Sequence, residues 1–205
     1  MSGGAKGSTI IVPPSSKPCS MSWGWNGSKP LSMTGDSRIQ DSIVIHNVKF
    51  SVKLKQGRFN FLNSYKQRNF IVVREKYTYV IFKPNKEGVH HINITKVPSL
   101  EQVSSSVQHL KSMIIEGELS QPRIDNLTAT LNLQQTLNLY SLYDSMKQDF
   151  KNIRFCPWKF PALFWRQTCG TLYFFASGKV NLVGFKTPEQ LNDACRQCLA
   201  VMKKY

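Results

Sequence analysis

The chain has 205 residues and carries 27 lysine and arginine side chains against 12 carboxylates, which gives a formal net charge of +15. A field of this sign favours nucleic acid or an anionic membrane surface as a partner and says nothing about the fold. No apolar run is long enough to cross a bilayer and the N-terminus lacks the apolar stretch of a secretory signal, so we expect an intracellular protein with no membrane partner.

The first half begins with a segment of low complexity. Residues 1–40 are dominated by Gly, Ser, Pro and Lys, and this composition predicts a disordered N-terminal arm. Folding is predicted to start near Ile43, where IVIHNVKFSVKLKQ alternates apolar and polar residues as a two-faced strand does. After it we predict a short helix in GRFNFLNSYKQ, a hairpin in RNFIVVREKYTYVIF, an edge strand in GVHHINITK and a helix started by Pro98.

The second half repeats this order. IHNVKFSVKLKQ, Ile45–Gln56, aligns without a gap on IDNLTATLNLQQ, Ile124–Gln135. A helix candidate, LNLYSLYDSMKQDF, a hairpin in WKFPALFWRQTCGTLYFF, an edge strand in GKVNLVGFK and a closing helix follow. We therefore interpret residues 41–120 and 121–205 as two copies of one unit.

Helices are expected to cover one face of a sheet. The closing helix has a clear start, because Thr187-Pro188-Glu189-Gln190 combines a threonine cap, a proline in the first helical position and a glutamine three residues after the cap. An apolar stripe then follows at helical spacing: Leu191, Ala194, Cys195, Cys198, Leu199 and Met202. Two tandem units of this kind tend to form one continuous antiparallel sheet, which its own twist curves.

Aromatic side chains are concentrated in KFPALFWRQTCGTLYFFASGK, Lys159–Lys179. A sheet with one buried face can hide only about half of them. The other aromatics are therefore expected on the face that no helix covers.

Four blocks of the second half resemble, in order, the strands of the TATA-box-binding protein family. IDNLTATLNL is similar to the family's opening strand, FPALFWR to its F-P-x-L-x-x-R strand, and LYFFASGKVNLVGFK to its strand with S-G-K and the following strand with x-G-x-K. Through the internal repeat the resemblance spans residues 43–205. It implies an α+β fold, a two-repeat saddle in which a curved antiparallel β-sheet has helices on its convex side.

The resemblance also implies that the concave face lies on the minor groove of DNA. Proteins read this groove by its shape, by a few donors and by apolar side chains wedged between base steps. Phe160 and Phe175 take the two wedge positions of the second repeat, with Pro161 and Tyr173 beside them. By internal alignment their counterparts are Phe70 and Phe82, with Ile71 and Val80 alongside. The span from Phe70 to Phe82 has fewer residues than that from Phe160 to Phe175. The first hairpin, around Glu75 to Tyr77, is therefore expected to be short.

Polar contacts are expected on the same face. Asn47 and Asn126 occupy equivalent places in the two repeats, and their amide NH2 groups can donate to base acceptors. Val183 stands where the family carries a groove-facing threonine, with Asn93 as its expected counterpart, so TATA preference is expected to be relaxed or altered. The phosphate contacts that the resemblance implies are Arg166, Lys179 and Lys186, with Lys96 as the first-repeat match.

Nothing in the sequence points to catalysis. We find no Ser-His-Asp arrangement, phosphate-cradling glycine loop or carboxylate pair, so we expect no enzyme, no catalytic residue and no cofactor. Cys195 and Cys198 form a C-x-x-C inside a helical pattern without a second pair, which favours reduced thiols over a zinc site, and we expect no metal. His90 and His91 are interpreted as structural or solvent-facing.

As partners the resemblance implies double-stranded promoter DNA, IIA-like and IIB-like general transcription factors and RNA polymerase. The location would be the nucleus or, for a viral protein, the intracellular site of transcription. The apolar face also favours a homodimer when no DNA is bound. Two alternatives stay open: a degenerate saddle that is a protein-interaction scaffold in transcription without TATA binding, and a sheet whose aromatics stack on unpaired RNA bases.

Overall fold

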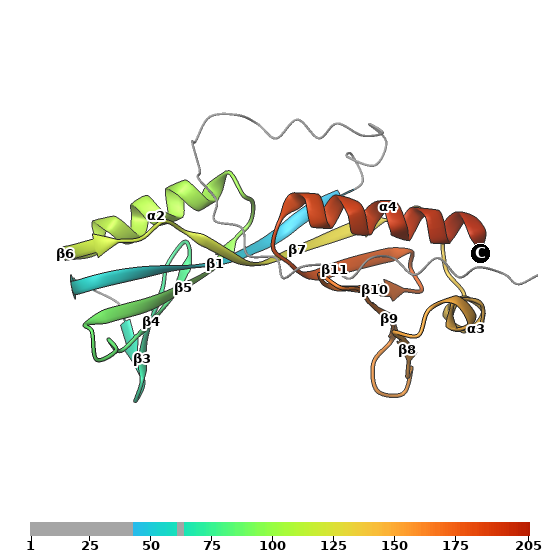
Figure 1. Cartoon of the computed structure of the whole chain (residues 1–205), viewed down its shortest axis with the longest axis horizontal. Helices are drawn as coiled ribbons and strands as arrows, with labels where there is room; N and C mark the ends of the chain where they lie inside the picture. The colour runs from blue at the N-terminus through green and yellow to red at the C-terminus, as the bar shows by residue number, and fades with distance from the viewer. Residues whose placement is uncertain (1–42, 61–63) are drawn as a thin grey trace, which may run out of the picture. The chain divides into compact units, whose positions relative to one another are not determined.

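A computed structural model describes residues 43–60 and 64–205, and it confirms the α+β saddle with a curved antiparallel sheet. Eleven strands form one sheet, and three helices accompany it in the described residues (Figure 1). The first half holds β1 (Ile43–Phe59), β2 (Ser64–Lys66), β3 (Phe70–Arg74), β4 (Thr78–Phe82), β5 (Val89–Val97), α2 (Gln102–Ser112) and β6 (Ile114–Leu119). The second holds β7 (Arg123–Asn132), α3 (Leu139–Asp149), β8 (Ile153–Phe155), β9 (Ala162–Arg166), β10 (Thr171–Phe175), β11 (Lys179–Phe185) and α4 (Pro188–Lys204). The predicted N-terminal arm, residues 1–40, lies outside the described residues.

The strand order is the same on both sides of a central pair. It runs β2-β3-β4-β5-β1-β7-β11-β10-β9-β8, and β6 pairs with the far end of β1. β5 and β11 each lie between two strands, so the prediction that they are edge strands is wrong. Their polar residues alternate because one face of the sheet has no helix on it, and this pattern is the same in an interior strand as in an edge strand.

Helices α2 and α4 lie on the same side of the sheet (Figure 1). The predicted cap of α4 is present: Thr187 Oγ1 accepts a hydrogen bond from the Gln190 amide at 3.3 Å, and Gln190 Oε1 accepts one from the Lys186 amide at 2.9 Å. α3 packs at the outer edge beside β8 and β9, where the rings of Phe150 and Trp165 are 4.7 Å apart. None of the helices in the described part of the chain is long and apolar enough to cross a membrane.

The helix predicted in GRFNFLNSYKQ, residues 57–67, is wrong. β1 continues to Phe59 and β2 occupies Ser64–Lys66, with residues 61–63 outside the description. The extension of β1 pairs with β6, so the backbone groups of this segment are satisfied in the sheet. Gly57 and two asparagines also make the segment a poor helix former. The equivalent helix of the second half, α3, is present as predicted.

In both repeats the strand next to the central pair, β5 or β11, has a residue with positive φ near its end. The position of this residue shows that the internal alignment must be corrected. Asn47 Oδ1 accepts a hydrogen bond from the Lys96 amide at 3.1 Å, and Asn126 Oδ1 accepts one from the Gly184 amide at 2.7 Å. Lys96 and Gly184 both have positive φ, 62° and 95°. Lys96 is therefore the counterpart of Gly184, and the expectation that it matches Lys186 is wrong.

The same correction moves the threonine position. Thr95 pairs with Thr78 as Val183 pairs with Thr171, so Thr95 is the counterpart of Val183. Asn93, which the sequence alignment placed there, is instead the counterpart of Asn181. An ungapped alignment on the final lysines misses this shift because a lysine occupies the left-handed position where glycine is usual. The first repeat thus keeps a threonine that the second repeat has lost.

Replacing Lys96 by glycine is expected to raise the free energy of unfolding by roughly 1 kcal/mol, because the left-handed backbone costs a non-glycine residue about that much. Urea denaturation of the wild-type and variant proteins measures the difference. Gly184→Lys is the matched control and should lower stability by a similar amount. A Lys96→Gly protein that is less stable than wild type would contradict the assignment.

Candidate nucleic-acid interface

The sheet has one face turned away from α2 and α4, which we call the open face. Alternation along β10 defines it: Leu172 and Phe174 are fully buried toward the helices, whereas Tyr173 and Phe175 are half-buried on the other side. The outer strands of both halves bend away from α2 and α4, so the open face is concave (Figure 1).

Four aromatic rings form a cluster on the open face of the second repeat: Phe160, Phe164, Tyr173 and Phe175. The ring of Phe160 lies 5.3 Å from that of Phe164, 6.4 Å from Tyr173 and 6.2 Å from Phe175. Phe160 remains 41% exposed, with Pro161 exposed next to it. Phe164 was not among the residues selected from the sequence, although strict alternation back from the buried Trp165 would have placed it on this face.

In the first repeat the open face carries a smaller aromatic pair. Phe70 lies directly opposite Phe82 across β3 and β4, with ring centroids 5.8 Å apart, and Val80 follows on the same face. The strand register matches Phe70 with Ala162, because Phe82 and Phe175 are equivalent, so the alignment of Phe70 with Phe160 is wrong by two residues. The span from Phe160 to Phe175 is longer than that from Phe70 to Phe82, and two thirds of this difference comes from the misalignment. The first hairpin loop is therefore only slightly shorter than the second.

Ile71 is on the other face. It pairs with Ile81, which is buried under the helices, and packs against the core itself. The expectation that Ile71 lies beside the wedges is therefore wrong, and Val72, which pairs with Val80, takes that place. The error arose because Phe160 and Pro161 precede β9, whereas Phe70 and Ile71 are consecutive residues of β3, where neighbouring side chains point to opposite faces.

The two asparagines have fixed orientations at the centre of the open face. Their amide oxygens are both occupied by the backbone amides of Lys96 and Gly184, so their NH2 groups are directed away from those bonds. Asn126 Nδ2 donates to Thr128 Oγ1 at 3.1 Å. Asn47 and Asn126 thus hold donors where the two repeats meet, in agreement with the predicted equivalence.

Cations lie where the hairpins meet the open face. Arg166 is exposed at the end of β9, Lys179 begins β11, and Lys186 follows it. Arg74 ends β3 and pairs with Thr78 as Arg166 pairs with Thr171, so Arg74 is the counterpart of Arg166. The sequence reading missed Arg74, although both hairpins have an arginine at the end of their first strand.

Several cysteine, histidine and tyrosine side chains are buried or bonded within the protein. Burial raises the pKa of the Cys195 thiol to about 12 and raises the pKa of Cys198 as well, with a further contribution from Cys195, so the thiolate forms that bind metals are disfavoured. His90 bonds the Phe82 carbonyl at 2.9 Å. His109 links Tyr79 and Glu75, at 2.9 and 3.0 Å, and so ties the first hairpin to α2. Burial, with smaller contributions from Tyr77 and Glu75, raises the pKa of Tyr79.

Comparison with known proteins places this geometry in context. The family described as "Transcription factor TFIID (or TATA-binding protein, TBP)" matches residues 121–205. Proteins named TATA-box-binding protein from Sulfolobus acidocaldarius and Sulfurisphaera tokodaii are 34% and 32% identical over 84 residues. That alignment covers 40% of this chain and 41% and 40% of theirs, so the match spans about two fifths of the length of these relatives. Among solved structures, Methanococcus jannaschii TBP matches with a TM-score of 0.64 at 22% identity, over 80% of this chain and 99% of that chain. The sequence match thus lies in the second repeat, and the fold match extends across both.

Proposed function

We propose that the chain is a divergent member of the TATA-binding protein family and a transcription initiation factor that binds and bends A·T-rich, TATA-like promoter DNA in the minor groove. The observation that supports this most strongly is the aromatic cluster of Phe160, Phe164, Tyr173 and Phe175 on a concave face that no described helix covers. A set of rings that packs together and remains partly exposed becomes dry only when a partner covers it.

In this proposal the rings act as wedges. Phe160 and Phe175 enter one base step and Phe70 and Phe82 another, with Pro161, Tyr173 and Val80 packed against the opened steps. Unstacking costs a few kcal/mol per step, and the contacts that only bent DNA can make offset this cost. A·T-rich steps that deform easily lower the cost, which gives a preference without a hydrogen-bond code.

Polar groups then position the duplex. The NH2 groups of Asn47 and Asn126 donate to minor-groove acceptors, and Val183 and Thr95 lie beside them on the open face. Arg166, Lys179, Lys186 and Arg74 neutralise phosphates at the rim. Lys96 remains a predicted phosphate contact. In the corrected alignment it corresponds to Gly184, next to the central asparagines, and not to Lys186.

The remaining functional proposals follow from the family. We propose IIA-like and IIB-like factors and RNA polymerase as partners, nucleation of the preinitiation complex as the result, and the nucleus or another intracellular site of transcription as the location. The protein would have no enzymatic activity. The homodimer expected in the absence of DNA remains a prediction.

Binding to three probes of equal length tests the proposal: an A·T-rich duplex, a G·C-rich duplex and a single-stranded RNA. We expect the A·T-rich duplex to bind at least roughly tenfold more tightly than the G·C-rich one, a difference of about 1.4 kcal/mol. Fluorescence anisotropy of labelled probes measures the dissociation constants. Tighter binding to RNA would favour the RNA-binding alternative, and no binding to any probe would favour the scaffold.

A further inference from the structure

The two central strands differ in charge on the open face. β1 presents Lys49, Lys53 and Lys55 there, because these residues alternate with buried Phe50, Val52 and Leu54. At the corresponding positions of the second repeat the chain has Thr128, Asn132 and Gln134. For Lys49 and Lys53 this correspondence holds in three dimensions, because Lys49 pairs with Asn126 as Thr128 pairs with Asn47, and Lys53 pairs with His91 as Asn132 pairs with Lys179. Gln134 lies just beyond the end of β7. Three ammonium groups thus lie on one side of the centre, where the other side has neutral residues.

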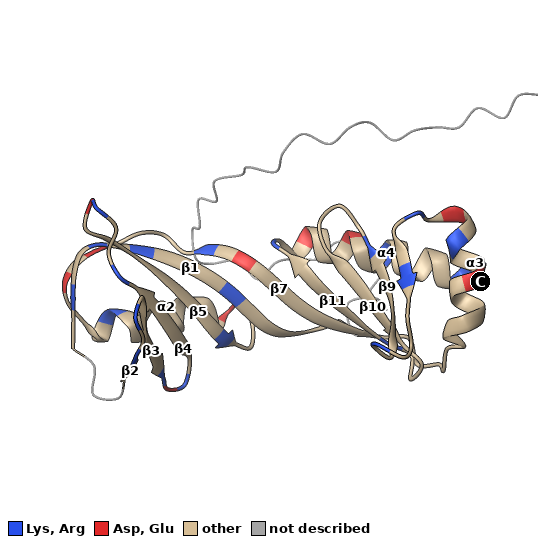
Figure 2. Cartoon of the chain, turned by 90° about the horizontal axis from the view of Figure 1, so that it is seen from below, with Lys and Arg blue, Asp and Glu red and all other residues tan. Residues whose placement is uncertain are grey.

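The three lysines, which we call the β1 lysine row, are not neutralised within the protein. In the described part of the chain none of them has a carboxylate within ion-pair distance. Arg123 also lies near this side of the face, but its guanidinium pairs with Asp125 at 3.1 Å, so we leave it out. Figure 2 shows basic segments along β1 and few along β10 and β11.

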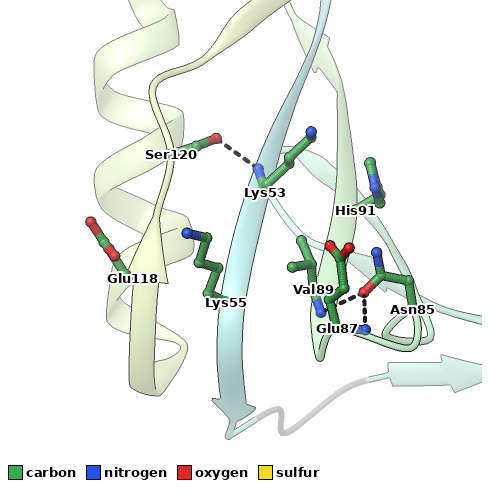
Figure 3. A pocket seen from close by; sticks show the side chains of 8 residues that line it. All are labelled: Lys53, Lys55, Asn85, Glu87, Val89, His91, Glu118 and Ser120. Carbon is green, nitrogen blue, oxygen red and sulfur yellow. Dashed lines mark hydrogen bonds between the residues drawn. The ribbon is translucent and has the colours of Figure 1, made fainter.

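Two members of the row line a cavity of about 290 Å³ between β1, β5 and β6 (Figure 3). Lys53 is paired across the strands with His91, and Lys55 with Val89 on one side and Glu118 on the other. Glu87 also lines the cavity, so its interior is of mixed charge. The excess of positive charge lies along the strand, from Lys49 to Lys53, and we assign the function to the row and not to the cavity.

The aromatic residues are distributed in the opposite way. The second repeat has a cluster of four rings on its open face, whereas the first has the pair Phe70 and Phe82 and the outer Tyr65. The second repeat does carry cations on this face: Lys179 on β11, which pairs with Asn132 of the central strand β7, and Arg154 on β8. The first repeat therefore has more cations along its own central strand, β1, and the second has more aromatic rings.

We propose that the β1 lysine row binds phosphate groups of the DNA backbone, so that the first repeat holds the duplex mainly by charge, the second mainly by inserted rings, and the DNA lies in one direction along the face. This proposal rests on the proposed function. Duplex DNA carries a negative charge about every 1.7 Å along its axis, which complements a row of cations on one strand. Because the two repeats have similar folds, the fold alone would allow the duplex to bind in either of two opposite directions. The difference in charge and aromatic content between the repeats favours one of them.

The test exchanges the row for the residues of the other repeat: Lys49→Thr, Lys53→Asn and Lys55→Gln in the full chain. Binding to an A·T-rich duplex is measured at several salt concentrations. Because each phosphate contact contributes about 0.9 to the slope of log K against log [salt], we expect the slope to become less steep by about 2.7 while bending persists. The single variant Lys53→Asn should change it by about 0.9 and serves if the triple variant does not fold.

The control replaces three exposed lysines that lie outside the strands of the sheet by neutral residues: Lys111 on α2, Lys203 on α4 and Lys151 after α3. It changes the net charge equally and should change the slope by less than about one unit. A lysine-row variant whose slope equals that of wild type, while wild type still prefers the A·T-rich duplex, overturns this proposal and leaves the proposed function in place. If wild type binds no duplex at any salt concentration, both fail.

The direction is measured separately. A dye on exposed Cys169, with Cys19 and Cys156 replaced by serine, reports its distance to an acceptor at either end of an asymmetric duplex. We expect unequal energy transfer to the two ends in wild type and a smaller difference in the lysine-row variant. Equal transfer to both ends in wild type overturns the directional part of the proposal.

Discussion

Replacing Phe160 and Phe175 together by alanine is expected to abolish most of the bending of an A·T-rich duplex and to weaken binding at least roughly 30-fold. The two rings are 6.2 Å apart on the open face and are the proposed wedge of the second repeat. Removal of buried aromatic anchors from an interface typically costs about 2 kcal/mol or more, which corresponds to this factor. Energy transfer between dyes at the two ends of the duplex measures bending, and the same titration gives the affinity.

Tyr140→Ala is the matched control for this pair. Tyr140 is an exposed aromatic on α3 whose ring packs on Phe155, away from the open face, so its loss should leave bending unchanged. A G·C-rich duplex should bend less with wild type than the A·T-rich one. If the double variant bends DNA as wild type does, the rings are not wedges, whatever the affinity.

Phe174→Ala is expected to lower the free energy of unfolding by about 3–5 kcal/mol, the usual cost of truncating a fully buried phenylalanine. Phe174 is 0% exposed and its ring is stacked against Trp165 on the helix side of β10. Its neighbour Phe175 points to the open face, so Phe175→Ala should cost less than about 1 kcal/mol in stability. Urea denaturation of the two single variants measures this difference.

The two phenylalanines control for each other, because they have the same chemistry and adjacent positions on one strand. The prediction is a reciprocal pattern, in which Phe174→Ala damages stability and Phe175→Ala damages DNA binding. Equal losses of stability in the two variants would mean that the open face is part of the hydrophobic core, and would remove the basis of the proposed interface.

The sequence predicted most of the fold because the internal repeat supplied two readings of each element. The alternation around Ile45–Gln56 and Ile124–Gln135 located the central strands, and the cap at Thr187 located α4. The helix expected in residues 57–67 failed because the repeat was assumed to be complete. In the structure β6 supplies hydrogen-bond partners to that segment, and a partner so far along the chain leaves no local pattern.

The candidate site was predicted less evenly. In the second repeat Phe160, Tyr173 and Phe175 lie together on the open face, as the spacing of the motifs predicted, while their contact with DNA stays a prediction. In the first repeat Ile71 fell on the wrong face and Lys96 was matched with the wrong residue. The match of Lys96 was wrong by two residues, a shift that keeps the face and hardly alters composition or periodicity. Ile71 was matched with Pro161, which lies before β9, where strand alternation does not apply. Pairing across strands was needed to find Val72, Thr95 and Arg74.

Strand β1 belongs to both repeats at once. Its residues from Ile43 to Ser51 pair with β7, those from Val48 to Lys55 pair with β5, and those from Leu54 to Phe59 pair with β6. During synthesis β1 leaves the ribosome before β7 and therefore has an unpaired edge until β7 has followed it. Pairing between segments so far apart in the chain slows folding, and the edge of β1 stays exposed until β7 pairs with it. The two halves are thus similar in structure but are not independent folding units, and a first half produced alone would leave the central edge of its sheet open to other chains.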